Sequence, residues 1–131
     1  MINSAPHFVY KILTTSQWEA IQQNGFTSEF ASELDKRDGY IHLSQSHQVA
    51  PIAQKYFSNM TDGVLLKIDF AKIQPLVKWE PNSKGEDFPH VYGELPKEAI
   101  IHQHTPFNTQ TFNFESLMEA NQKNSSYGLK P

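Results

Sequence analysis

Short apolar runs separated by polar turns predict a set of β-strands in the first hundred residues. The runs are rich in β-branched and aromatic residues, which favour extended structure. They cover residues 7–13, 40–43, 64–70, 76–79 and 100–104. The run over 64–70 is nearly continuous in apolar character, which predicts the central strand of a sheet.

Two helices are predicted between these strands, and the first is marked by its ends. Ser16 and Glu19 have the spacing of a capping box, so a helix should begin near residue 16. Gly25 is a natural stop for it. The polar segment 27–38 fits either a loop or a short helical turn.

The second predicted helix is the most clearly amphipathic segment of the chain. Five apolar residues follow helical spacing, namely Val49, Ile52, Ala53, Tyr56 and Phe57. Ser44 or Ser46 would cap this helix. Proline is tolerated only in about the first turn of a helix, so Pro51 favours a start near Ser46.

Strands outnumber helices, which predicts an α+β fold with a small, antiparallel or mixed sheet. Residues 1–107 are expected to form a single domain, because domains of roughly 100–150 residues are common. The segment 108–131 is rich in Asn, Gln and Ser. We expect it to be a polar tail with a helix at most over 113–122 and disorder from residue 123.

Composition narrows the class of protein further. The chain has 131 residues, no cysteine and a formal net charge of −3. These features exclude a disulfide scaffold, a cysteine nucleophile and a thiolate metal site, and they disfavour nonspecific nucleic-acid binding. No apolar run approaches the ~20 residues of a membrane span, and no signal peptide is recognisable. We therefore expect a cytoplasmic protein without a membrane partner.

Histidines supply the first candidate chemistry. In the predicted strand over 40–43, Tyr40 and His42 share one face, and His42 lies just before a helix start, where ligand sites often form. The alternative is a buried histidine bonded to backbone. His102 and His104 share a strand face but lack a third nearby ligand, so we predict no metal site.

Two further segments present polar side chains on a stiff backbone. The segment 88–96 contains His90, Tyr92 and Glu94 between prolines, and Trp79 is followed by Glu80. Rigid segments of this kind are typical of binding sites, although each also fits a well-packed strand end. The glycine-rich, P-loop, nucleophile-elbow and zincin motifs are missing, which argues against those enzyme classes.

Five strings identify the chain as resembling the bacterial domain of unknown function 952 family. They are Val-Tyr-Lys-Ile-Leu at 9–13 (with Trp18 following), Asp-Gly-Tyr-Ile-His-Leu-Ser at 38–44, Val-Leu-Leu-Lys-Ile-Asp at 64–69, Lys-Trp-Glu-Pro at 78–81 and Phe-Pro-His-Val-Tyr-Gly-Glu-Leu-Pro at 88–96. The resemblance covers roughly residues 8–104 and leaves the tail outside.

The order of these strings is also similar, more distantly, to the RNA 2′-phosphotransferases of the ADP-ribosyltransferase superfamily. That resemblance implies a small split, mainly antiparallel β-core with flanking helices, and a cleft that binds NAD. His42 and Ser44 match its His-Leu-Ser string. Tyr10 stands where that family has a histidine, and Glu94 is a counterpart of a late acidic residue in the superfamily.

The resemblance implies cleavage of the nicotinamide–ribose bond of NAD and transfer of ADP-ribose, with a nucleotide as ligand and an RNA or protein as acceptor. The candidate catalytic residues are His42, His90, Glu80 and Glu94. The candidate NAD-binding residues are Tyr10, Lys11, Ser44, Trp79 and Tyr92. Two alternatives are a non-catalytic module that binds a nucleotide or small anion, and a structural or interaction domain. The oligomeric state stays open.

Overall fold

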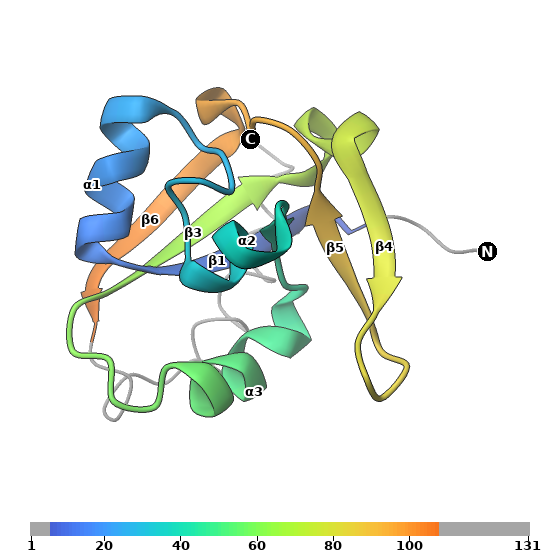
Figure 1. Cartoon of the computed structure of the whole chain (residues 1–131), viewed down its shortest axis with the longest axis horizontal. Coiled ribbons are helices and arrows are strands. Elements are labelled where there is room, and N and C mark those ends of the chain that lie inside the picture. Colours follow the sequence, from blue (N-terminus) through green and yellow to red (C-terminus); the bar gives the residue numbers. More distant parts are fainter. Residues whose placement is uncertain (1–5, 108–131) are drawn as a thin grey trace, which may run out of the picture.

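The computed structural model describes residues 6–107, which form two three-stranded sheets (Figure 1). The first sheet has the order β1-β3-β6, formed by Phe8–Thr14, Gly63–Asp69 and Ile100–Phe107. The second has the order β2-β5-β4, formed by Ile41–His42, Asp87–Val91 and Val77–Pro81. All strand pairs are antiparallel, which confirms the α+β class. The predicted central strand is confirmed as β3.

Three α-helices and three short 3₁₀ turns connect these strands. The helices are α1 (Thr15–Asn24), α2 (Glu33–Asp38) and α3 (Ser46–Tyr56). The 3₁₀ turns are η1 (Phe70–Lys72), η2 (Gln74–Leu76) and η3 (Lys97–Ala99). The segment 27–38 is thus partly helical. The helix expected over 113–122 and the disorder expected from residue 123 lie outside the described residues.

The predicted cap of α1 is wrong by two residues. The capping box consists of Thr14 and Gln17, since Thr14 Oγ1 accepts from Gln17 N at 3.1 Å and Gln17 Oε1 accepts from Thr14 N at 2.9 Å. Thr14 ends β1 in an extended conformation, which is the geometry of an N-cap. Ser16 therefore lies inside the helix. Gly25 ends α1 as predicted.

The predicted serine cap of α3 is also wrong, although its start at Ser46 is confirmed. Gln45 occupies the cap position, and its backbone N–H donates to Gln48 Oε1 at 2.9 Å. Ser44 is held instead in a two-bond bridge with Tyr10, at 2.8 and 2.9 Å. This bridge gives the Ser44 backbone an extended partner and joins β1 of the first sheet to the segment after β2.

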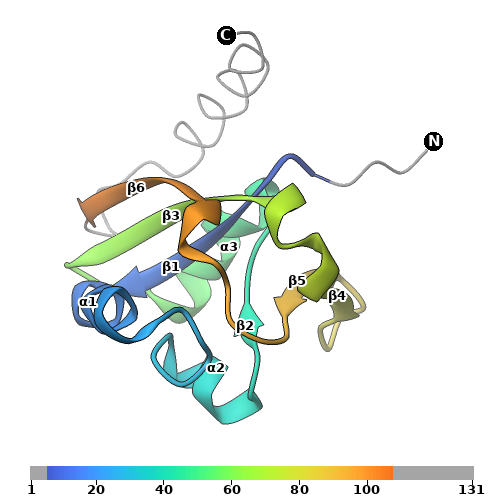
Figure 2. The same ribbon diagram turned by 90° about the horizontal axis from the view of Figure 1, so that it is seen from above.

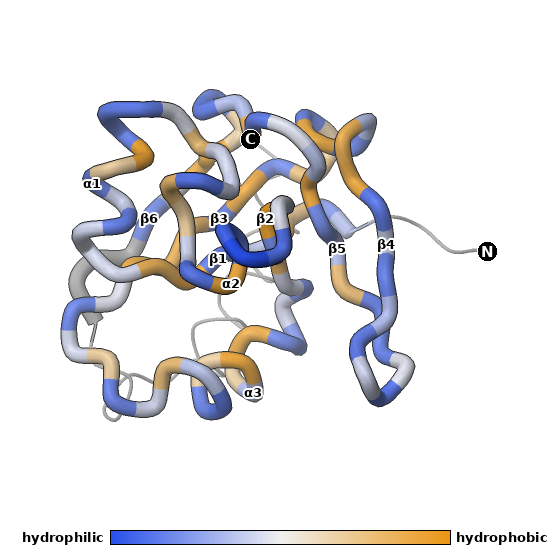
Figure 3. The backbone as a smooth tube through the Cα atoms, viewed as in Figure 1, coloured by the Kyte–Doolittle hydropathy of each residue, from blue (hydrophilic) through white to orange (hydrophobic). Residues whose placement is uncertain are grey.

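The bridge at Ser44 holds the two sheets beside each other, as Figure 2 shows from above. A second bridge, between Phe26 and Leu95, joins the segment after α1 to the segment after β5. Ile41 and Leu43 are 0% and 1% exposed, so this face of the predicted strand is buried in the core. Their neighbours on the opposite face are free to build a site. Figure 3 contrasts the hydrophilic α2 with the apolar stretches of the strands.

The core consists of two clusters that share the first sheet. The larger includes Val9, Leu66 and Ile41, and the smaller packs α3 against β1 through Tyr10 and Val49. Burial of these side chains supplies the main stabilisation of the fold. None of the helices in the described part of the chain is long and apolar enough to cross a membrane.

Candidate functional site

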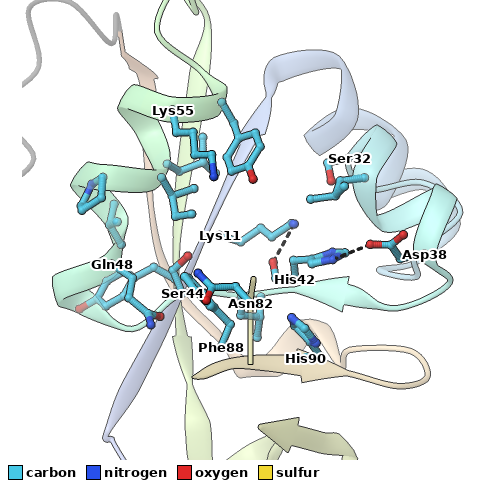
Figure 4. A pocket seen from close by; sticks show the side chains of 18 of the residues that line it. Lys11, Ser32, Asp38, His42, Ser44, Gln48, Lys55, Asn82, Phe88 and His90 are labelled. Carbon is cyan, nitrogen blue, oxygen red and sulfur yellow. Dashed lines mark hydrogen bonds and ion pairs between the residues drawn. The ribbon is translucent and has the colours of Figure 1, made fainter. Parts of the chain in front are cut away.

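A pocket of about 700 Å³ opens between the two sheets and the helices α2 and α3 (Figure 4). Its walls come from β1, α2, β2, α3, β4 and β5 and from the turn between β4 and β5. Small-molecule sites usually occupy roughly 300–1,000 Å³, so the pocket is large enough for a nucleotide. The long-range pairing of the strands brings its walls together from distant parts of the sequence.

Asp35 is the buried anchor of one side of the site. Its side chain is 0% exposed, and its Oδ2 lies 2.7 Å from Nζ of Lys11. Its Oδ1 accepts from the backbone N–H of His42 at 2.9 Å and lies 2.6 Å from Nδ1 of the same residue. Nζ of Lys11 also donates to the carbonyl oxygen of His42 at 2.8 Å. Asp35 therefore fixes both the backbone and the ring of His42.

The charge of Asp35 is stabilised in spite of its burial. Burial raises the pKa of the Asp35 carboxyl, but the charge of Lys11 and the hydrogen bonds from His42 and Lys11 lower it to about 2. An isolated buried charge would be costly, so Lys11 and Asp35 depend on each other. Lys11 is buried, and its Nζ already contacts the Asp35 carboxylate and the carbonyl oxygen of His42, so Lys11 helps to hold His42 in place.

Asp38 closes the other side of the His42 ring. Its Oδ2 lies 3.0 Å from Nε2 of His42. Arg37 also pairs with Asp38, with Nε 2.8 Å from Oδ1. The hydrogen bond from Arg37 is the main cause that lowers the pKa of Asp38. Both ring nitrogens of His42 thus contact carboxylate oxygens.

His90 forms a second pair with a carboxylate, on the neighbouring strand. Its Nδ1 lies 2.6 Å from Oε1 of Glu80, and the Tyr92 hydroxyl donates to the same carboxylate at 2.9 Å. Burial lowers the pKa of His90, against the opposing effect of the bond to Glu80. Hydrogen bonds from His90 and Tyr92 lower the pKa of Glu80. An ionised Glu80 only accepts, so Nδ1 of His90 carries a proton and Nε2 is the nitrogen able to take one.

Tyr40 joins the two histidines into one cluster. Its ring stacks on that of His90 with centroids 4.4 Å apart, and it lies 4.6 Å from the ring of His42 and 4.9 Å from that of Tyr92. The two imidazoles are themselves only 4.8 Å apart. The β2–β5 register places His42 directly opposite His90. This pairing produces the cluster.

The β4–β5 turn is tied to α3 on the far side of the pocket. Nε2 of Gln48 donates to Oε2 of Glu86 and to the carbonyl oxygen of Asp87, both at 2.9 Å. Gln48 is 2% exposed, which makes this contact part of the fold. Lys55 and Lys84 also line the pocket and bring positive charge to it.

The pocket brings together six of the nine predicted site residues: His42, His90, Glu80, Tyr10, Lys11 and Ser44. Tyr92 contacts the site through Glu80 but does not line the pocket. Trp79 and Glu94 lie outside its lining. Trp79 lies beside Phe70, with ring centroids 5.8 Å apart, because neighbouring residues of β4 face opposite sides. Glu94 is exposed and lies near Gly25.

Four residues at the site are additional to the predicted ones: Asp35, Asp38, Tyr40 and Gln48. One sequence signal was available, since Ser32 and Asp35 have the spacing of a capping box. Such a spacing marks a helix start but does not reveal that Asp35 also binds a histidine and a lysine.

Among the side chains that the structure describes, no group of three or more His, Cys, Asp or Glu residues is arranged to hold a metal ion. His102 and His104 belong to β6, opposite Lys67 and Leu65 of β3. Their side chains lie outside the part that the structure describes. The predicted lack of a metal site therefore stays a prediction.

The fold and the site define an α+β protein with two histidine–carboxylate pairs at one pocket. A model of the family "Protein of unknown function (DUF952)" matches residues 12–103, and the chain belongs to this family. A search of curated proteins finds no match.

Two solved structures of one bacterial protein resemble the chain. The crystal structure of protein CC0527 from Caulobacter crescentus is 32% identical, has a TM-score of 0.67 and covers 75% of this chain and 84% of that protein. Its solution NMR structure has a TM-score of 0.63, the same identity, and covers 75% and 83% respectively. These findings do not address ADP-ribosyl transfer or the similarity to RNA 2′-phosphotransferases, which stay predictions.

Proposed function

We propose that the pocket binds NAD and that the protein cleaves the bond between nicotinamide and ribose, transferring ADP-ribose to an acceptor. The observation that carries the proposal is the convergence of His42 and His90 on one pocket, each with Nδ1 on a carboxylate. Paired imidazoles backed by carboxylates are suited to proton transfer. The distant resemblance of the His-Leu-Ser string to NAD-using transferases supplies the choice of substrate.

The proposed reaction needs one proton acceptor. The C1′–N bond breaks, and its electron pair leaves with nicotinamide, which becomes neutral. The oxygen of the acceptor, a water molecule or a hydroxyl of RNA or protein, bonds to C1′ and releases its proton. His90 is the residue suited to take that proton, because Glu80 orients its Nδ1 and leaves Nε2 as the basic nitrogen.

The pocket also offers charges for the two ends of the substrate. Positive charge develops on the ribose as nicotinamide leaves, and the Glu80 carboxylate lies at the pocket beside His90. Lys55 and Lys84 line the same pocket and would attract the diphosphate as point charges. Tyr40 presents an aromatic ring suited to contact a flat heterocycle.

A non-catalytic module that binds a nucleotide is the second candidate, and one observation favours it. Both ring nitrogens of His42 and Nζ of Lys11 already have partners within the protein. As long as these contacts persist, the two side chains hold the structure and do not act directly on a ligand. Lys55, Lys84 and Tyr40 would then bind the nucleotide at the pocket without turnover.

Turnover and binding, measured together, separate the two candidates. The full chain is incubated with NAD, nicotinamide release is followed by chromatography, and affinity is measured by calorimetry. The enzyme produces nicotinamide in proportion to time and protein. A binding module shows saturable binding without release. Neither binding nor release would contradict both candidates and favour an interaction domain.

A matched pair of variants shows whether the pocket is responsible. Glu80→Gln removes the carboxylate that orients His90, so release should slow by about tenfold or more. Glu98→Gln makes the same change of charge at an exposed position outside the pocket lining and serves as the control. Equal rates in the two variants would argue against the proposed site.

A further inference from the structure

The two carboxylates that contact the His42 ring are held very differently. Asp35 is fully buried and is fixed by contacts with Lys11 and His42 and by the backbone N–H of Ser32 at 3.3 Å. Asp38 is 23% exposed and contacts the ring only through Oδ2. Asp38 can therefore leave the ring without disturbing the core, whereas Asp35 cannot.

The contacts of His42 also define what the ring can offer to a ligand. An ionised carboxylate only accepts hydrogen bonds, so both contacts are made at once only when Nδ1 and Nε2 each carry a proton. The proton on Nε2 then points at Asp38. His42 and Asp38 both line the pocket, and Figure 4 shows their contact at its edge. A ligand that replaced Asp38 would meet the N–H donor at Nε2.

Oδ2 of Asp38 lies 3.0 Å from Nε2 of His42. We propose that a phosphate oxygen of the ligand binds Nε2 of His42 at this same position and replaces the Asp38 carboxylate. The pocket thus contains an oxyanion subsite that opens when Asp38 moves away. The proposal rests on the pocket being a ligand site, as in the proposed function, but it does not depend on bond cleavage.

The surrounding charges are consistent with such an exchange. When Asp38 departs, Lys11 still balances the buried charge of Asp35, so the loss of the Asp38 charge makes the subsite less negative. Arg37 keeps Asp38 paired, with Nε 2.8 Å from Oδ1 and a terminal guanidinium nitrogen 3.2 Å from Oδ2. The displaced carboxylate therefore does not become unpaired. A phosphate oxygen forms the same kind of charge-assisted bond that Asp38 now forms.

Asp38→Asn tests the exchange, with inorganic diphosphate as the probe and calorimetry as the measurement. Asn keeps the shape of the side chain but removes the charge that competes for His42. Because a partly exposed ion pair contributes about 1 kcal/mol, diphosphate should bind the variant about fivefold more tightly than the unmodified protein. Glu33→Gln is the matched control, since it removes one negative charge from the same pocket lining, whereas the carboxylates that contact His42 are those of Asp35 and Asp38. Its affinity should change by less than twofold.

A second variant keeps the test specific to His42. In Asp38→Asn combined with His42→Gln, the fivefold gain should disappear, while a gain that persists would assign the anion to Arg37 and overturn the proposal. Equal affinities of Asp38→Asn and Glu33→Gln, or no diphosphate binding by either, would also overturn it. If Asp38→Asn binds diphosphate more tightly but no nicotinamide is released from NAD, the subsite stands and the cleavage reaction fails.

Discussion

Asp35→Asn removes the charge that balances Lys11 inside the protein, and its effect on stability can be worked out from the structure. The Asp35 side chain is 0% exposed and Lys11 is 6% exposed, so the pair is shielded from water. Breaking a buried ion pair by removing one partner costs about 3–5 kcal/mol, because the other charge stays buried. Asn preserves the shape and part of the hydrogen bonding, which places the expected loss near 3 kcal/mol. This is a large share of a typical total stability of about 5–15 kcal/mol.

A double-mutant cycle measures the pair itself. Urea unfolding, followed by circular dichroism, gives the free energy for the unmodified protein, Asp35→Asn, Lys11→Met and the double variant. The double variant should lose about 2 kcal/mol less than the sum of the single losses, because it leaves no unpaired charge. Additive losses, or a loss below about 1 kcal/mol for Asp35→Asn, would refute the role of this pair.

Acid provides an independent check of the same carboxyl. The pKa of Asp35 is lowered from 3.8 to about 2 in the folded protein. The group therefore stabilises the fold above pH 3.8, by about 2 kcal/mol, and this contribution is lost as the pH falls towards 2. The difference in stability between the unmodified protein and Asp35→Asn should shrink over that interval. A constant difference would contradict the assignment.

The remaining predictions concern the second histidine and one glycine. The pKa of His90 lies below its ordinary value of 6.5, and the contact with Glu80 raises it. Glu80→Gln removes this contact and should lower the pKa further. In a pH–rate profile, the fall in nicotinamide release on the acidic side should therefore move to lower pH. An unchanged profile would exclude His90 as the base. Gly25→Ala should lower the free energy of unfolding in urea by about 2–3 kcal/mol. Gly25 has φ 106° and ψ 155°, which strains a residue with a side chain, and an added Cβ would lie 2.7 Å from a carboxylate oxygen of Glu94. Gly39→Ala, with φ 82° and nothing within 4 Å, should cost only about 1 kcal/mol, and equal losses would contradict this explanation.

Five of the six described strands and α3 could be predicted from their apolar runs, whereas β5 is additional because Pro89 interrupts the strand pattern. β3 is a nearly continuous apolar run of only seven residues, whereas the apolar residues of α3 follow helical spacing over eleven residues, so length and spacing together distinguish strand from helix. By contrast, α2 spans only six residues, all but Leu34 charged, so no periodicity marks it. The helix is instead specified by its ends, at Ser32 and at Gly39, which adopts a left-handed conformation.

The histidines and Glu80 could be predicted as site residues, but Asp35 could not, nor could the pairing of each histidine with its carboxylate. His42 meets Asp35 because the turn at Gly39 folds α2 back onto β2. His90 meets Glu80 because the β4–β5 register sets Lys78 opposite His90, which leaves Glu80 at the diagonal position on the same face. Helix-to-strand packing and strand register are tertiary properties. A single sequence contains no direct signal for either one.

The central claim is that His90 takes the proton of the acceptor during cleavage of NAD. The most direct measurement is the rate of nicotinamide release at saturating NAD for the unmodified protein and for His90→Gln, with circular dichroism to confirm that both are folded. General-base catalysis contributes about 10²–10⁴ in rate, so His90→Gln should release nicotinamide at least about a hundredfold more slowly. Equal rates for the two folded proteins, or no release by the unmodified protein, would contradict the claim.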